Sequence, residues 1–478
     1  MRVKRISVLL SPILSVLAVP THRWFCASSF RLKGIPRVRF RTVSQKGRKC
    51  SAYDLFSCFP EKFSAILEDP DGSGAQHLVS RSGQRHMLDA NGQQAGGNFF
   101  AIWEREINER RSYASPCIAH LFYAAYEAAD LIEDLPEPAS KPPVCILWTL
   151  HPDWSFCFAG ESVHLAAKTE ELLDELQHML DDAPLSSCEE SSDVAPGINL
   201  TAIQVTDGTQ YKKQVEQVKE LIAAGDIFQA NIARFWSLPF ATEGLEALYK
   251  RLRQVNTAPF SCFLRVESES DEMHILSASP ERLFRISVDG LVDTRPIAGT
   301  RRRGEGEMDT LLRDEMLLSD KERAEHIMLV DLERNDLGRV CVPGSVEVNE
   351  VMVVEGYATV QHIVSNVRGR LRDGLGLVDV FRAMFPGGTI TGCPKVHCME
   401  IIHGLEGRAR GPYTGGVGFS SWDGAADMNI LIRSFWHHEG RLNWAAGAGI
   451  VADSDPDAEL TETGHKAEGM MRALEIQG

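Results

Sequence analysis

The chain has 478 residues, of which 44% are hydrophobic and 24% charged, so it is long enough for two or three average globular domains or for one large composite domain. Its formal net charge of −16 argues against nucleic acid and anionic membrane surfaces as partners. Eleven cysteines without a C-x-x-C pair argue against a disulfide framework or a zinc site, and they predict reduced thiols in a compartment such as the cytoplasm.

Residues 1–50 form a basic leader that we set apart from the fold. Residues 1–53 contain twelve lysines and arginines and no acidic residue, and the other 38 basic and 66 acidic residues give the remainder a net charge of −28. The apolar run of the leader is interrupted by Pro12, is too short to span a bilayer and lacks a clean secretory cleavage site. Organellar targeting, an upstream start codon and a disordered tail all stay open as explanations.

Three regions follow the leader. Residues 54–183 alternate short apolar stretches with glycine, proline and aspartate, and they end in a helical segment at 169–183. Residues 184–200 are polar, acidic and rich in turn formers, which predicts a linker. Residues 201–476 have a different pattern, and we expect them to form the catalytic domain.

The last region mixes strands and helices. The patterns predict, in chain order, a helix at 208–226, a strand at 227–240, adjacent strands at 273–287 and 291–300, a helix with an acidic stripe at 307–336, a glycine-rich strand at 442–454 and a helix at 455–477. Because the strands and helices do not alternate regularly, they indicate an α+β fold built in layers.

Two Glu-x-x-Glu segments lie far apart in the sequence, Glu322 with Glu325 and Glu459 with Glu462. The i,i+3 spacing puts both carboxylates of a pair on one face of a helix. Four carboxylates that meet at one point would suit a hard divalent cation such as Mg2+. Each pair alone fits a solvated helix surface equally well, and Lys466 four residues after Glu462 fits an ordinary surface ion pair.

Several other residues are candidates for a site. The stretch FPGGTITGCPK (385–395) exposes backbone N–H groups and hydroxyls that suit an anion, although it does not match a Walker A sequence. Arg433 lies inside an apolar strand, so it needs a carboxylate partner from the protein or from a ligand. His362 has apolar neighbours and suits either a core position or a general acid. The sequence contains no nucleophile elbow, so a built-in glutaminase or hydrolase is unsupported.

The order of these motifs resembles that of the chorismate-utilising enzymes, which include the large subunits of anthranilate synthase and of 4-amino-4-deoxychorismate synthase. The resemblance is dense over about 205–475 and loose over 54–180. It is carried by SPE (279–281), RPIAGT (295–300), ERAEH and LVDLERNDLGRV (322–340), HIVS (362–365), PGGTITGCPK (386–395), NILIRS (429–434), GAGIVADS (447–454), and ELTE with the later lysine (459–466).

The resemblance implies a large α/β sandwich with the active site between its layers, and it assigns roles to named residues. The four glutamates of the two pairs, Glu322, Glu325, Glu459 and Glu462, would bind Mg2+, which holds the ring carboxylate of chorismate. The catalytic set would be His362 as the acid–base residue near the leaving group, Thr389 in contact with the substrate, and Glu281 lining the pocket. The expected substrate contacts are Arg433, whose guanidinium would hold the pyruvyl carboxylate, and Gly449, Gly447, Ala298, Gln229 and Lys466.

Two positions bear on the choice of reaction. Isochorismate and salicylate synthases carry a water-activating lysine where this chain has Gln229, so the ammonia-using branch is favoured. Aminodeoxychorismate synthases usually carry a lysine, as PIKGT, where this chain has Ala298; PIAGT is the anthranilate synthase pattern. The stretches RGPYTGGVGF, DMNILIRSF and YAAYEAADLIEDLP resemble the aminodeoxychorismate enzymes instead.

We therefore expect Mg2+-dependent amination of chorismate to 4-amino-4-deoxychorismate, in 4-aminobenzoate and folate biosynthesis. Ammonia would come from a separate glutamine amidotransferase subunit, since the chain lacks a glutaminase motif of its own. Anthranilate synthase of the tryptophan pathway is the alternative that Ala298 favours. A regulator that binds chorismate without turning it over is a third hypothesis, against which the complete set of candidate site residues argues.

Overall fold

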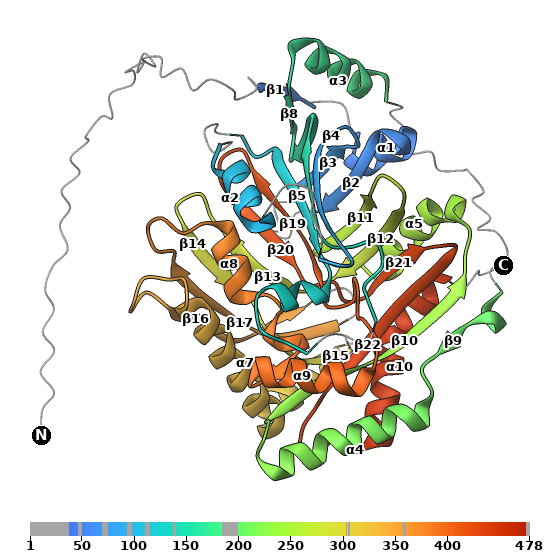
Figure 1. The fold of residues 1–478 in the computed structure, drawn as a ribbon, viewed down its shortest axis with the longest axis vertical. Coiled ribbons are helices and arrows are strands. Elements are labelled where there is room, and N and C mark those ends of the chain that lie inside the picture. Colours follow the sequence, from blue (N-terminus) through green and yellow to red (C-terminus); the bar gives the residue numbers. More distant parts are fainter. Residues whose placement is uncertain are drawn as a thin grey trace, which may run out of the picture. The chain divides into compact units, whose positions relative to one another are not determined.

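Two β-sheets carry the fold of this computed structural model (Figure 1). The structure describes residues 38–45, 50–68, 75–92, 98–109, 115–136, 140–183, 199–302, 304, 306–356 and 360–474, which all belong to one unit that begins at Arg37. Most of the basic leader and of the predicted linker lies outside the described residues. The division of the chain at residues 50, 183 and 200 stays a prediction.

The first sheet has 12 strands within the described residues, and neighbouring strands pair antiparallel in the order β1-β8-β7-β3-β2-β11-β12-β21-β22-β10-β18, with β9 paired to β10. Its strands are β1 (Arg39–Ser44), β2 (Phe63–Glu68), β3 (Gln76–Ser80), β7 (Trp154–Ala159), β8 (Ser162–Ala167), β9 (Gln204–Val205), β10 (Gln229–Pro239), β11 (Phe260–Glu267), β12 (Glu272–Ser279), β18 (Gly392–Cys393), β21 (Ser434–His438) and β22 (Arg441–Ile450). The paired strand β1 lies within the segment that we expected to be a leader.

The second sheet has 10 strands within the described residues, in the order β15-β17-β14-β13-β20-β19-β5-β6-β4, with β16 paired to β17. Its strands are β4 (Gly83–Asp89), β5 (Ile118–Ala124), β6 (Cys145–Pro152), β13 (Arg282–Ile286), β14 (Leu291–Thr294), β15 (Ile297–Arg302), β16 (Glu347–Gly356), β17 (Val360–Arg370), β19 (Gly416–Ser421) and β20 (Ala426–Asn429). Strands from before and after residue 200 share both sheets, so the two parts of the chain fold around common cores.

Ten α-helices of the described part flank the sheets. They are α1 (Ala52–Cys58), α2 (Phe99–Glu109), α3 (Glu170–Asp182), α4 (Gly208–Ala224), α5 (Leu245–Val255), α6 (Glu307–Leu318), α7 (Asp320–Gly338), α8 (Leu377–Met384), α9 (Lys395–Glu406) and α10 (Pro456–Leu474). No helix among the described residues is both long and apolar enough to cross a bilayer.

Three apolar cores define the layers. One lies between the sheets and joins Trp148 of β6 to Ile275 of β12. A second packs α1, α3, α5 and α10 on the first sheet, around Trp444. A third packs α2 and α8 on the second sheet, around Phe381. Helices therefore cover both sheets and the sheets face each other, which confirms the predicted α+β sandwich.

Two predicted elements are divided in the structure. The expected strand at 273–287 ends at Ser279 in the first sheet and resumes at Arg282 in the second, because Pro280 has no N–H to continue a ladder. This crossing puts Glu281 between the sheets. The expected helix at 307–336 breaks at Ser319, whose side chain accepts a hydrogen bond from the N–H of Glu322 and caps α7.

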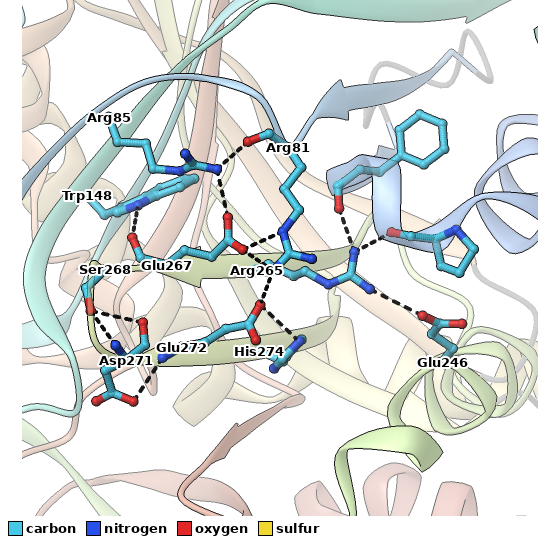
Figure 2. A network of polar contacts seen from close by, with 12 residues as sticks. Arg81, Arg85, Trp148, Glu246, Arg265, Glu267, Ser268, Asp271, Glu272 and His274 are labelled. Atoms are coloured by element: carbon cyan, nitrogen blue, oxygen red, sulfur yellow. Dashed lines mark hydrogen bonds and ion pairs between the residues drawn. The ribbon is translucent and has the colours of Figure 1, made fainter.

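A polar network joins the two sheets at one end of β11 (Figure 2). Arg81, between β3 and β4, donates to Glu267 at the end of β11 over 2.5 Å, and Arg85 of β4 donates to the other oxygen of Glu267 over 2.7 Å. The indole N–H of Trp148 donates to the backbone carbonyl of Glu267 over 3.1 Å. Every charge in this group has a partner inside the protein, so the network is structural.

Candidate active site

Gln229, Glu325 and Gly449 meet where β10, α7 and β22 come together. The Nε2 of Gln229 donates to Oε1 of Glu325 over 3.1 Å. A Cβ atom on Gly449 would lie 2.1 Å from Gln229 Nε2 and 3.5 Å from Glu325 Oε1, so only glycine leaves room for this contact. The backbone of Gly449 therefore lies beside a carboxylate of the first Glu-x-x-Glu pair.

The second pair approaches the same strand from α10, which packs on β22. Glu459 is buried, and its Oε1 accepts a hydrogen bond from the hydroxyl of Ser454 over 2.6 Å. Lys466 Nζ donates to the backbone carbonyl of Gly447 over 3.0 Å and forms an ion pair with Glu462 over 2.8 Å. The surface ion pair that the sequence allowed is present, and its lysine also contacts the glycine-rich strand β22.

Glu325 of the first pair thus lies beside Gly449, and the second pair is linked to the region of β22 through Ser454 and Lys466. Within the described ranges, no three histidine, cysteine or acidic side chains are arranged tightly enough to hold a metal ion by themselves. The donor set consists of carboxylate oxygens, which are the ligands that Mg2+ prefers, and Mg2+ usually keeps several waters in its coordination shell. The chemistry of the residues therefore fits this ion.

Glu281 and Thr389 form the part of the site that lies between the sheets. Glu281 is 6% exposed. Burial raises the pKa of Glu281 to about 7, while the Thr389 hydroxyl, the Ile297 backbone N–H and the charges of Arg433 and Lys466 act in the opposite direction. The Thr389 oxygen is buried and has no hydrogen-bond partner of good distance and angle among the described residues, although it lies close enough to Glu281 to affect that pKa. A buried hydroxyl of this kind suits a ligand.

Arg433 and His362 line the same space. Arg433 has a φ of +51°, a strained value for a side chain of this size, and its guanidinium has neither a hydrogen bond nor an ion pair among the described residues. Burial lowers the pKa of Arg433, and the charge of Glu281 opposes that shift. Burial and the nearby Arg433 lower the pKa of His362 to about 4, so the imidazole is neutral at pH 7 and able to accept a proton.

The backbone of Ala298 lies next to this region. It follows Ile297 on β15 and pairs with Ile363 of β17, next to His362. Its neighbour Ile297 is the residue whose N–H interacts with Glu281. The RPIAGT stretch is thus a strand beside the site.

A second carboxylate pair on α7, Glu333 and Asp336, was missed from the sequence. Glu333 is 4% exposed and Asp336 is 3% exposed. Asp336 forms an ion pair with Lys395, the lysine that ends the FPGGTITGCPK stretch. The pair repeats the i,i+3 spacing of Glu322 and Glu325 eleven residues later, and eleven residues are just over three helical turns. This periodicity places all four acids on one face of α7 and is the signal that would have found them.

These groups together can do specific chemistry. Arg433 offers a guanidinium to a carboxylate, Glu281 holds or releases a proton near neutral pH, and His362 accepts one. Glu325, Glu462 and Lys466 lie near the glycine-rich end of β22. Such a set can bind a small molecule that carries more than one carboxylate and exchange protons with it.

Similar proteins agree with this chemistry. The family model described as chorismate binding enzyme matches residues 64–472. The anthranilate synthase component I-like protein of Synechocystis sp. is 42% identical over 361 residues, which cover 74% of this chain and 72% of that protein. Aminodeoxychorismate synthase component 1 of Bacillus subtilis is 45% identical over 307 residues, which cover 64% of this chain and 63% of that protein.

The fold has a match among solved structures. The crystal structure of anthranilate synthase component I from Streptococcus pneumoniae superimposes with a TM-score of 0.69 at 27% identity, and the match covers 94% of this chain and 95% of that one. The sheets, the candidate site and these relatives lead to one conclusion: the chain belongs to the chorismate-binding enzyme family.

Proposed function

We propose that this protein replaces the ring hydroxyl of chorismate with ammonia and releases water, which gives 4-amino-4-deoxychorismate. Ammonia would be supplied by a separate glutamine amidotransferase subunit, because the sequence has no glutaminase motif. The observation that carries the proposal is the contact of Gln229 with Glu325. An amide at this position cannot take a proton from water as a lysine could, so ammonia is the nucleophile that the site favours.

The described residues support a division of roles. Mg2+, when bound by Glu322, Glu325, Glu459 and Glu462, would neutralise the ring carboxylate and draw electron density from the ring. Arg433 would hold the second carboxylate through its guanidinium, which has no hydrogen bond or ion pair among the described residues. His362 and Glu281 would hold the protons that the leaving hydroxyl and the incoming ammonia exchange.

Three sequence stretches support the aminodeoxychorismate branch. RGPYTGGVGF forms the turn before β19 and β19 itself, and DMNILIRSF runs from β20 to β21 through Arg433. YAAYEAADLIEDLP follows β5, and its Glu127 accepts hydrogen bonds from the backbone N–H groups of Arg410 and Gly411. These three stretches therefore contact one another in the fold.

Anthranilate synthase is a second candidate, and Ala298 is the observation that favours it. A lysine at this position of β15 would attack the ring covalently, whereas alanine leaves the ring open to ammonia itself. Relatives named for each reaction have similar identity to this chain, 45% for aminodeoxychorismate synthase component 1 of Bacillus subtilis and 46% for anthranilate synthase component 1 of Saccharolobus solfataricus. If the first proposal is right, Ala298 means that ammonia attacks directly and no enzyme-bound adduct forms.

Product identification separates the two candidates. Purified protein is incubated with chorismate, Mg2+ and an ammonium salt, and the products are followed by fluorescence and mass spectrometry. We expect 4-amino-4-deoxychorismate without release of pyruvate. Anthranilate with pyruvate would overturn the first proposal in favour of the second, and a protein that binds chorismate without turnover would overturn both.

A further inference from the structure

The Gly388 loop, defined as residues 385–394, packs directly on α7. A Cβ atom on Gly388 would lie 2.3 Å from Leu332 Cδ2 and 3.3 Å from Glu333 Oε1, so the loop backbone approaches the helix as closely as glycine allows. The backbone N–H of Gly388 also interacts with the Glu333 carboxyl. Glu333 therefore contacts the loop at the residue before Thr389.

The end of the loop is attached to the same helix one turn later. Lys395, the first residue of α9, forms a buried ion pair with Asp336 and donates to the backbone carbonyl of Met384 over 3.1 Å. Asp336 and Lys395 thus hold the two ends of the loop together, while Glu333 holds its centre. Since α7 also carries Glu325, one rigid helix connects the loop with the carboxylates near Gly449.

Burial of the Glu333 carboxyl costs free energy, and its neighbours do not fully compensate for this cost. Its surroundings comprise the acids Asp336 and Glu281, the cation Lys395 and the Gly388 N–H, and burial together with Asp336 raises its pKa. If Glu333 only filled space, an apolar side chain of similar size would serve equally well without the free-energy cost of burying a carboxyl. An acceptor placed against a loop N–H suggests a role in holding that loop.

We propose that Glu333 is a positioning residue of the active site. By holding the Gly388 backbone against α7, it keeps the Thr389 hydroxyl next to Glu281 and directed at the substrate. This inference rests on the proposed function and on the expectation from the family resemblance that Thr389 contacts bound chorismate. Glu333 acts through Thr389 and does not itself touch the substrate.

The test uses two variants of similar size. Glu333→Gln keeps a carbonyl oxygen that accepts the Gly388 N–H, whereas Glu333→Met removes the acceptor and fills the same space. We expect Glu333→Met to fold at least as stably as the wild type and to raise the KM for chorismate about tenfold with kcat nearly unchanged, and Glu333→Gln to stay within about threefold of the wild type in KM. Asp331→Ala is the matched control, because this exposed acid lies on the same helix and pairs only with Arg334 among the described residues.

A double-mutant cycle with Thr389→Ala shows whether Glu333 acts through the loop. The double variant Glu333→Met/Thr389→Ala should be no worse than Thr389→Ala alone, because the second change removes the group that the first one misplaces. Additive effects, or an unchanged KM in Glu333→Met, would overturn the inference.

Hydrogen exchange tests the same contact without turnover. Amides of residues 386–394 should exchange about tenfold faster in Glu333→Met than in the wild type, while Asp331→Ala leaves them unchanged. Equal exchange in all three proteins would overturn the inference even if chorismate proved to be the wrong substrate. An inactive wild type with faster exchange in Glu333→Met would instead contradict only the proposed function.

Discussion

Arg265 is buried and Arg433 is partly buried, and the surroundings of these two arginines are opposite. Arg265 donates to the backbone carbonyls of Pro60 and Phe63 over 2.5 and 2.6 Å and to Glu246 over 3.2 Å (Figure 2). The guanidinium of Arg433 has neither a hydrogen bond nor an ion pair among the described residues, and the backbone of Arg433 is strained at a φ of +51°. One guanidinium is used by the protein, and the other is available to a ligand.

The presence or absence of hydrogen-bond partners in the protein distinguishes structural charges from candidate functional ones in this chain. Around Arg265 the charges and carbonyls satisfy one another, so their removal should cost stability. Around Arg433 the fold bears a cost for a largely desolvated charge and for strain, and the charge of Glu281 opposes that cost without a hydrogen bond or an ion pair. Such a cost is expected where a substrate supplies the missing partner.

The largest effect on stability is expected for Arg265→Ala. This change removes the hydrogen bonds of the guanidinium to the carbonyls of Pro60 and Phe63 and its ion pair with Glu246, and we expect a loss of about 2–4 kcal/mol of unfolding free energy. Arg433→Ala should change the unfolding free energy by less than about 1 kcal/mol, or raise it, because it removes an unpaired charge. Urea unfolding of both variants measures the contrast. Equal losses in the two would mean that Arg433 is a structural residue as well.

A second contrast concerns Glu281 and depends on pH. Its pKa of about 7 in the folded protein lies above the ordinary value of 4.5, so the folded state binds the proton more tightly than the unfolded state. Its contribution to stability is therefore lost as the pH rises from about 4.5 to about 7. Glu281→Gln stays neutral, and it should exceed the wild type in unfolding free energy by up to about 3 kcal/mol above pH 7, with little difference near pH 4.5.

Urea unfolding at pH 5 and pH 8 checks this sign. The same difference between Glu281→Gln and the wild type at both pH values would show that Glu281 does not titrate in this range.

The smallest expected effects distinguish two glycines. Gly449→Ala pushes its Cβ against Gln229 Nε2, so Gln229 must leave Glu325, and we expect a loss of about 1–2 kcal/mol with a clear fall in chorismate turnover. Gly464→Ala, in the interior of α10 with nothing within 4 Å of its Cβ, should gain up to about 1 kcal/mol of unfolding free energy. Thermal unfolding and a turnover assay on both proteins measure this. A Gly449→Ala variant as active as the wild type would remove Gly449 from the site.

Much of the fold was predictable because local signals were strong. The helix expected at 208–226 is α4, which Asp207 caps at its start and Gly225 ends with a φ of +85°. The layered α+β sandwich followed from the mixture of elements and from the family resemblance. The crossing between sheets at Pro280 was not predictable, since strands in different sheets have the same local pattern.

The site was predictable only in part. Gln229, Glu325 and Gly449 were each expected from the resemblance, and the structure brings them together. Glu333 was missed because its partner, the Gly388 N–H, lies more than fifty residues further along the chain, and only the fold brings the two together. Whether the partner of Arg433 comes from the protein or from a ligand was also left open, because the sequence does not show which side chains contact its guanidinium.

The most direct measurement is a calorimetric titration of chorismate into the wild type and into Arg433→Ala, with Mg2+ present. If the guanidinium of Arg433 is reserved for a substrate carboxylate, Arg433→Ala should bind chorismate at least about 30-fold more weakly while it unfolds at the same urea concentration as the wild type. Equal affinity of the two proteins for chorismate would contradict the account.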